Sequence, residues 1–291
     1  MIAETAQGGS CVEQNYEQRG YLKEDYRLFH LNGAMEERLD WHYHTFHKII
    51  LFLSGSASYG IEGRSYPLRP GDLVLVPQGC IHRPEIEPGT PYERVIVYLS
   101  ADFLRRSSTA ECALERCFTQ AKEQFRFVVR PQGKDRGPRL VLAELENEMQ
   151  QEGFGQKLLS DALLFQFLIG IARGMQAHAL AFTEPDSCDE KTAAILQYLS
   201  EHLTEPVSID DLAAHFFVSK YHMMRRFREQ TGYTIHNYLV SKRLMLAREL
   251  IAGGMRVREA SDASGFGDYS AFSRAYKRQF GEAPGTVRTG T

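Results

Sequence analysis

Between residues 26 and 100, hydrophobic and polar positions follow the short-period pattern of β-strands. The alternation is clearest at 56–61, and turns with glycine or proline, such as Arg69-Pro70-Gly71, separate the apolar runs. Closely spaced short strands with regular turns predict a β-barrel or a double-sheet jelly roll. The short apolar runs lie at 49–53, 72–76 and 95–99.

After a polar break at 131–138, the spacing of the apolar positions changes from that of a strand to that of a helix. Apolar residues then recur at helical spacing over 140–150 and 157–175. These helices either close the barrel domain or, because they exceed what one barrel wall needs, form a dimer interface within 139–176. The chain is therefore expected to comprise a polar arm (1–20), a barrel domain with its helices (21–182), a polar linker (183–190) and a helical domain (191–291).

The helical region contains an internal repeat, because residues 208–232 align with 257–281 at an offset of 49 positions. Each copy reads as a short apolar helix, a tight turn, a capping Ser or Asp, and a basic amphipathic helix ending at Gly. This is the outline of a helix-turn-helix, whose second helix enters a DNA major groove. A helix predicted over 235–251 would hold the copies apart, as reading two successive grooves about 34 Å apart requires.

The expected buried positions of the two second helices define their exposed faces. Met223 and Phe227 face the core in the first copy, and Phe272 and Tyr276 do so in the second. A solvated helix face is the alternative for any one exposed residue, but two copies in the same frame favour a binding face. Arg225 suits bidentate contact with guanine. The expected DNA-binding residues are Lys220, Tyr221, His222, Met224, Arg225, Arg228, Ser270, Ala271, Arg274, Lys277 and Arg278.

Charge is unevenly distributed along the chain. The net charge is −3, yet residues 187–291 carry 14 Lys and Arg against 12 Asp and Glu, a net charge of +2. No apolar run long enough for a membrane span is expected, and no secretory leader is visible at the N-terminus. Five scattered cysteines without a CxxC pair fit reduced thiols, so a cytoplasmic protein is expected.

Residues 264–281 (SGFGDYSAFSRAYKRQFG), followed by Ala283-Pro284, resemble the signature of AraC-family transcriptional regulators. The resemblance covers about 100 C-terminal residues and implies a bacterial regulator that reads DNA with both units. It departs from the family only mildly, with Glu259-Ala260-Ser261 at the start of the second unit. The family's base-reading places fall on Tyr221, His222, Met224 and Arg225 in the first unit, and on Ser270, Ala271 and Arg274 in the second. Met224 and Ala271 cannot donate hydrogen bonds, so they would read thymine methyls or nothing.

The N-terminal region has a second resemblance. Residues 71–82, ending Pro77-Gln78-Gly79-Cys80-Ile81-His82, resemble the second cupin motif, and His42-Tyr43-His44 resembles the start of the first. Where metal-binding cupins usually carry a Glu, this chain has His47 and Lys48. Three uses of His42, His44 and His82 remain open: contacts to an organic effector, structural hydrogen bonds, or metal ligation. Trp41 either stacks on a sugar or belongs to the barrel core.

Together these patterns predict a multi-domain α+β protein: a cupin-like β-barrel with following helices, then an all-α domain with two helix-turn-helix units. The favoured function is a homodimeric transcription regulator that binds double-stranded DNA and a small-molecule effector, such as a sugar, through Trp41, His42, His44 and His82. No cofactor, resident metal or catalytic residue is expected, and no membrane. Alternatives are a metal-dependent cupin enzyme fused to a DNA-binding domain, and an architectural DNA binder without an effector.

Overall fold

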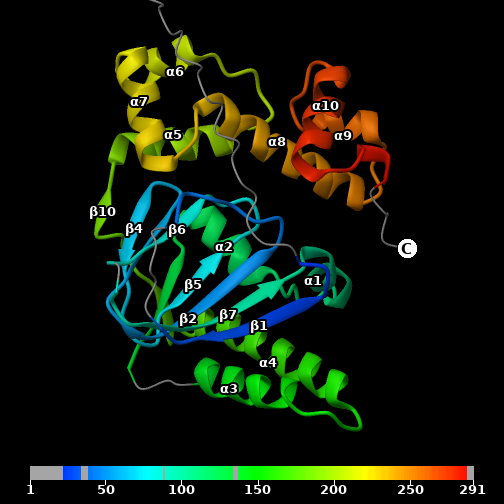
Figure 1. The fold of residues 1–291 in the computed structure, drawn as a ribbon. Helices are drawn as coiled ribbons and strands as arrows, with labels where there is room; N and C mark the ends of the chain where they lie inside the picture. Colours follow the sequence, from blue (N-terminus) through cyan, green and yellow to red (C-terminus); the bar gives the residue numbers. More distant parts are fainter. Residues whose placement is uncertain (1–21, 34–38, 88, 134–136, 287–291) are drawn as a thin grey trace, which may run out of the picture.

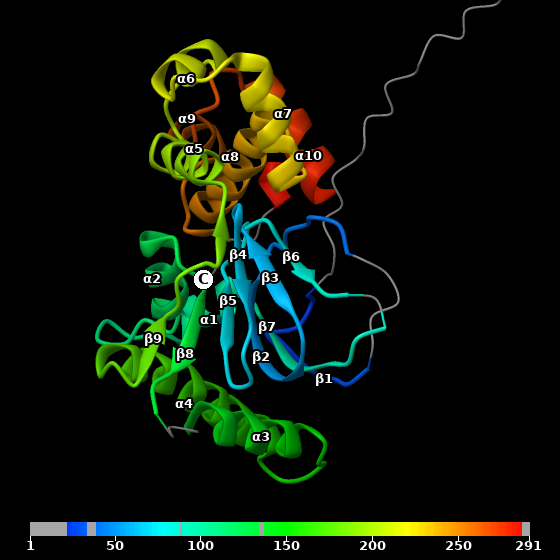
Figure 2. The same cartoon turned by 90° about the vertical axis from the view of Figure 1, so that its left-hand side faces the viewer.

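The computed structural model describes residues 22–33, 39–87, 89–133 and 137–286. The arm expected at 1–20 lies outside the described residues. Two β-sheets occupy the middle of the molecule, and the C-terminal helices cover one end (Figure 1). Both views place α3 (Gly137–Met149) and α4 (Gln156–Gln176) at the opposite end (Figures 1 and 2).

All strand pairing among the described residues is antiparallel. A six-stranded sheet has the order β1-β7-β2-β5-β8-β9, and a four-stranded sheet has the order β10-β4-β3-β6. The expected runs at 49–53, 72–76 and 95–99 fall within or overlap β2, β5 and β7. The strands are β1 (Tyr26–Leu31), β2 (His47–Gly55), β3 (Ser58–Ile61), β4 (Arg64–Pro67), β5 (Leu73–Val76), β6 (His82–Glu85), β7 (Tyr92–Leu99), β8 (Val128–Pro131), β9 (Leu180–Phe182) and β10 (Ser187–Cys188).

The two sheets enclose a shared core. Lys48 lies opposite Tyr98 and Ile50 lies opposite Ile96, so these four side chains share one face of the larger sheet. Ile61 lies opposite His82 on the smaller sheet. Buried residues from both sheets belong to one hydrophobic cluster. The double-sheet architecture expected from the alternation is therefore confirmed, and the interior receives every second residue of each strand.

Four helices follow the first seven strands: α1 (Ala101–Ser107), α2 (Arg116–Gln124), α3 and α4. α4 is long and apolar enough to cross a membrane, with a mean hydropathy of 1.4. Leu164, Phe167 and Leu168 nevertheless bury one face of it in the barrel core. Leu158 and Leu159 remain exposed. α4 is therefore a packed domain helix that also carries an uncovered apolar face.

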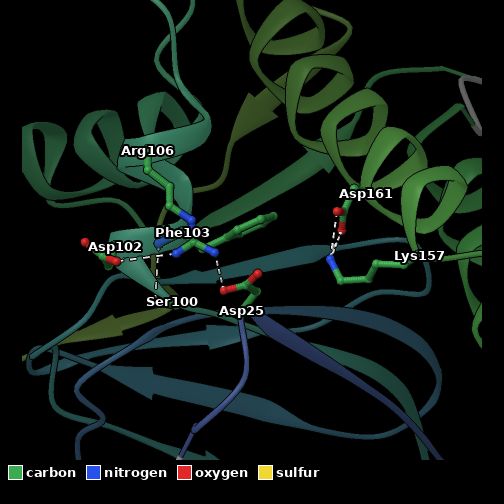
Figure 3. A network of polar contacts seen from close by, with 7 residues as sticks. All are labelled: Asp25, Ser100, Asp102, Phe103, Arg106, Lys157 and Asp161. Atoms are coloured by element: carbon green, nitrogen blue, oxygen red, sulfur yellow. Dashed lines mark hydrogen bonds and ion pairs between the residues drawn. The ribbon is translucent and has the colours of Figure 1, made fainter. Parts of the chain in front are cut away.

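A polar and aromatic network fixes α1 and α4 beside β1 (Figure 3). Ser100 caps α1, its hydroxyl oxygen accepting a hydrogen bond from Phe103 N at 3.4 Å. Arg106 forms an ion pair with Asp25, the residue just before β1. The Phe103 ring lies 5.1 Å from the Arg106 guanidinium carbon and 5.8 Å from Lys157 Nζ on α4. Cation–π contacts thus add to apolar packing where the helices meet the sheet.

The C-terminal domain confirms the internal repeat. Ser219 caps α7 and Asp268 caps α10, and these helices end at Gly232 and Gly281 with φ of 75° and 74°. That left-handed conformation explains why glycine ends both copies. The C-terminal helices are α5 (Glu190–Glu201), α6 (Ile209–His215), α7 (Lys220–Thr231), α8 (Ile235–Ala252), α9 (Val257–Ala263), α10 (Tyr269–Phe280) and the short 3-10 helix η1 (Pro284–Thr286).

The segment expected to be a linker, 183–190, contains regular structure. Ser187 and Cys188 form β10, which pairs with β4 at Ser65 and Arg64, and α5 already begins at Glu190. A two-residue strand carries too little pattern to be read from sequence. The barrel sheet therefore continues almost to the first C-terminal helix.

Candidate functional site

The exposed face of α7 carries the residues expected there. Met223 and Phe227 are fully buried, as predicted, and they fix the rotation of the helix. Tyr221 is 86% exposed, and Met224 also reaches solvent. The predicted DNA-binding residues of this unit, all exposed, are Lys220, Tyr221, His222, Met224, Arg225 and Arg228.

α10 repeats this arrangement. Phe272 and Tyr276 are buried, their rings 5.5 Å apart, which confirms the predicted frame. In the view of Figure 2, α7 and α10 lie on the same side of α8, the side away from α6 and α9. The predicted DNA-binding residues of this unit are exposed as well: Ser270, Ala271, Arg274, Lys277 and Arg278.

Some basic side chains of α7 and α10 form ion pairs within the protein, and others form none among the described residues. Lys220 pairs with Asp210 at 2.9 Å, and Arg225 pairs loosely with Glu229 at 3.7 Å. Arg226, which sequence reasoning left out of the DNA-binding set, is held by Asp189 at 2.9 Å. Within the described ranges, Arg274 and Lys277 form no ion pair. The pairs of Lys220 and Arg225 are exposed and therefore weak, so these side chains, like Arg274 and Lys277, can turn towards an approaching polyanion. Arg226 is held more firmly, because both its Nε and its Nη2 donate to Asp189, which is largely buried.

Inside the barrel, the three predicted histidines come together. The ring centroids of His42 and His82 are 4.5 Å apart, and that of His44 lies 5.1 and 4.8 Å from them. Nδ1 of His42 donates to the Asp40 carbonyl at 2.8 Å, and Nδ1 of His82 donates to the Cys80 carbonyl at 2.9 Å. A carbonyl can only accept, so Nδ1 carries a proton in both rings.

The three rings are buried, and His82 is neutral. Burial, followed by the nearby charge of Lys48, holds the pKa of His82 well below its ordinary value. Each imidazole offers one nitrogen within 4.8 Å of the others, and no other group of three such residues occurs in the described part of the chain. The three nitrogens could hold a transition metal, but they could equally accept hydrogen bonds from an organic ligand.

His47 and Lys48, which occupy the place of the usual cupin Glu, point in opposite directions. His47 stacks on Phe118 of α2 with a centroid distance of 4.3 Å, and its Nδ1 accepts a hydrogen bond from Gln78 N. Lys48 points into the barrel, where Nζ donates to Tyr59 Oη at 3.1 Å. Alternation along β2 produces this split. The barrel interior therefore contains an ammonium group where metal-binding relatives of the motif carry a carboxylate.

Trp41 does not join the histidine cluster through its ring. The indole occupies the space that a side chain at Gly60 would need. Trp41 also leaves no room for a Cβ at Gly232, the C-cap residue of α7. Arg83 covers the ring at 4.5 Å. The indole therefore lies where the barrel meets the helical domain. The sequence analysis predicted either stacking on a sugar or a place in the barrel core, and did not predict this boundary position.

The segments that carry the histidines also form the boundary with the helical domain. His42 and His82 face each other as a backbone pair, with N–O distances of 3.1 and 2.9 Å. Their neighbours Tyr43 and Ile81 point to the opposite side, into a hydrophobic cluster shared with α5, α6, α7 and α8. One layer of backbone thus separates the histidine cluster from the first helix-turn-helix unit.

A buried polar network fastens the same boundary, and sequence reasoning did not identify it. Glu62, in the turn between β3 and β4, accepts hydrogen bonds from Tyr238 Oη at 2.9 Å, Lys242 Nζ at 2.7 Å and Ile81 N at 3.0 Å. A cleft of about 160 Å³ opens beside it, lined in part by Cys80 and Lys242. Both partners on α8 lie on the helix that joins the two DNA-reading units.

Comparisons with known proteins agree with this division of the chain. The family model described as an AraC-like ligand-binding domain matches residues 27–168, and one described as a helix-turn-helix domain matches 212–290. The HTH-type transcriptional activator RhaS of Klebsiella pneumoniae is 25% identical over 86% of this chain and 87% of its own length. The probable transcriptional regulator LumQ of Photobacterium leiognathi is 22% identical over 86% and 92%.

Among solved structures, the chain is similar to ToxT from Vibrio cholerae O395, with 13% identity, a TM-score of 0.36, and coverage of 90% of this chain and 96% of that one. It is also similar to the DNA-binding domain of AdpA in complex with a target DNA. That match has 29% identity and a TM-score of 0.31, and covers 32% of this chain and 85% of the other.

Proposed function

The chain belongs to the AraC family of transcription regulators, and from this we propose that a small molecule bound in its barrel controls how its two helix-turn-helix units bind a specific DNA site. The observation that carries the proposal is the matched pair of capped helices, α7 and α10, with buried Met223/Phe227 and Phe272/Tyr276 in the same frame. Their exposed faces suit two major grooves.

In this proposal the two units contribute unequally. Tyr221, His222 and Arg225 of the first unit can hydrogen-bond to base edges, and Arg225 suits guanine. The second unit offers Arg274 between small neighbours, Ser270 and Ala271. The first unit then supplies most of the sequence discrimination. Phosphate contacts are assigned to Lys220, Arg228, Lys277 and Arg278.

We propose the interior beside His42, His44 and His82 as the effector site. Support comes from the alternation described above, in which His42 and His82 face inward while Tyr43 and Ile81 contact the helical domain. A ligand that moves the histidines must move the same backbone that packs on the first unit. A differential affinity worth about 1–3 kcal/mol would be enough to shift DNA binding by about 5- to 150-fold.

We further propose that the protein is a cytoplasmic homodimer joined through α3 and α4. The apolar side chains exposed on α3, on α4 and on the loop between them support the proposal. Monomeric soluble proteins rarely leave a large apolar patch in contact with water. The exposed side chains are Leu140, Phe154, Leu158 and Leu159. The two helices lie at the end of the molecule opposite the DNA-reading helices (Figure 1), so a dimer formed there would leave both helical domains free.

Selection of bound sequences from a random DNA library tests the central proposal with the full chain. We expect enrichment of a motif with two elements separated by about one helical turn, roughly 10 base pairs. Binding should weaken steeply with salt. Recovery of DNA without any enriched sequence would overturn it.

A further inference from the structure

Lys48 is deeply buried, and a charged side chain rarely lies so deep without an opposite charge. It is 6% exposed, and its ammonium donates to the neutral hydroxyl of Tyr59. The aromatic rings of Tyr59 and Tyr98 lie 5.8 and 6.0 Å from Nζ. These contacts offset part of the free-energy cost of removing the ammonium from water, but they do not neutralise its charge.

Arg94, which is only partly buried, adds a second cation beside Lys48. It follows Tyr92 on β7 and lies opposite Phe52, whose position on β2 shares the inner face with Lys48. Its guanidinium donates to the Tyr92 carbonyl at 2.8 Å and lies 4.1 Å from the Tyr92 ring centroid. The two cations repel each other, since the charge of Arg94 contributes, after burial, to lowering the pKa of Lys48 to about 7.

The buried carboxylates among the described residues, Glu62 and Asp72, are engaged elsewhere. Glu62 binds Tyr238 and Lys242 of α8, and Asp72 binds Arg130 at 2.6 Å. Across the described ranges, neither Lys48 nor Arg94 forms an ion pair with an acidic side chain. One buried and one partly buried cation therefore lie together, and the described part of the chain does not supply their counter-charge.

The remaining polar groups around these cations suit hydroxyls. The hydroxyl of Tyr92 and Nε2 of His82 are buried, and no hydrogen-bond partner for either is found in the described residues. With Nδ1 of His82 donating to a carbonyl, Nε2 can only accept, which matches a ligand O–H. The aromatic faces of Tyr59 and Tyr98 can cover the carbon skeleton of a ligand.

We infer that the effector of this chain is a small hydroxylated organic acid whose anionic group binds Lys48 and Arg94 while its hydroxyls meet His82 and Tyr92. This inference rests on the proposed effector function of the barrel and narrows it from sugars in general to molecules of the sugar-acid type. It also explains why the interior carries Lys48 in place of the carboxylate of metal-binding cupins. A divalent cation on the three histidines would be repelled by the same ammonium.

Iodide is a suitable probe because it reports an anion site without knowledge of the natural effector. Crystals of the full chain soaked in sodium iodide should show an anomalous peak within hydrogen-bond distance of Lys48 Nζ. Lys48→Met, which keeps volume and removes charge, should abolish that peak. Lys157→Met, at an exposed lysine on α4, should leave it unchanged.

Two results would overturn the inference. One is an interior without iodide in the wild type while surface sites fill. The other is stoichiometric metal on the three histidines in protein purified without chelator.

A thermal-shift comparison separates this inference from the proposed function. Stabilisation by D-gluconate at matched ionic strength, absent with D-glucose and lost in Lys48→Met, supports the inference. Stabilisation by the neutral sugar alone refutes it while leaving an effector-binding regulator intact. The proposed function itself fails only if the wild type selects no DNA sequence, whatever the barrel binds.

Discussion

Tyr238 donates its hydroxyl hydrogen to Glu62 Oε2 at 2.9 Å, joining residues 176 positions apart across the boundary between the barrel and α8. Glu62 has φ of 47°, a left-handed conformation that costs a glutamate on the order of 1 kcal/mol or more. Together with Gly63 at 74°, it forms the tight turn between β3 and β4. The contacts to Tyr238 and Lys242 offset that strain, so the turn and the docking of α8 stabilise each other.

Replacing Glu62 should loosen this docking. Glu62→Ala leaves the Lys242 ammonium without its partner, and loss of one member of a buried pair typically costs about 3 kcal/mol or more. We expect a lower unfolding free energy in urea and faster proteolysis near β10, where the chain passes between domains. The double variant with Lys242→Met should recover part of the loss, because no unpaired charge remains.

Glu87→Ala is the matched control. Glu87 follows β6 and is exposed, so its removal should change stability by less than about 0.5 kcal/mol. If Glu62→Ala and Glu87→Ala behave alike, the Glu62 network does not hold the domains together.

The DNA-reading faces lead to a second prediction. Arg225→Ala and Arg274→Ala should each weaken binding to a selected site by about 1–3 kcal/mol and relax the preference for one base pair. Lys277→Ala should instead weaken all DNA alike and reduce the salt dependence. Fluorescence anisotropy with specific and scrambled duplexes at several salt concentrations measures both effects.

Arg105→Ala controls for loss of an exposed arginine, since Arg105 lies on α1 of the barrel domain and pairs only with Asp102 at 3.4 Å among the described residues. It should leave binding unchanged. Normal footprints from both the Arg225 and Arg274 variants would show that the groove assignment is wrong.

The helical domain could be predicted from sequence because its determinants are local. Met223 and Phe227 lie one helical turn apart, Ser219 caps the helix that they anchor, and Gly232 ends it. Every one of these signals lies within fourteen residues, and a second copy repeats them. Short-range periodicity and capping chemistry therefore fixed the frame of both recognition helices.

The barrel interior and the domain boundary depended on contacts distant in sequence. The resemblance to the two cupin motifs pointed to His42, His44 and His82, but the inward position of Lys48 follows from its pairing with Tyr98 on β7. Likewise, Glu62 could be read as a turn residue, whereas its bond to Tyr238 exists only because two domains dock. No local pattern encodes that docking, which is also why the place of Trp41 was not foreseen.

The exposed apolar face of α3 and α4 leads to a third prediction. Leu158→Asp should convert the proposed dimer into a monomer, because it places a charge among side chains that a partner would desolvate. Light scattering coupled to gel filtration gives the mass directly. Phe217→Asp is the control, another exposed apolar residue, in the turn before α7. A wild type that is already monomeric at micromolar concentration would contradict the proposed interface.

Lys48 gives a fourth prediction, on the pH dependence of stability. Burial lowers its pKa from 10.5 to about 7 in the folded protein. Between these values the unfolded chain binds one more proton than the folded chain, so this group makes stability rise with pH, by up to about 1.4 kcal/mol per pH unit. Below pH 7 both states hold the proton and its contribution becomes constant at its least favourable level.

Lys48→Met removes this dependence. We therefore expect the variant to be more stable than the wild type near neutral pH, and the difference to shrink as pH rises towards about 10. Urea unfolding of both proteins from about pH 6 to about 9.5 measures it, and taking the difference cancels the other titrating groups. Lys157→Met, at an exposed lysine, should run parallel to the wild type throughout. Parallel curves for Lys48→Met as well would mean that Lys48 keeps an ordinary pKa, and that the interior already supplies the counter-charge assigned here to the effector.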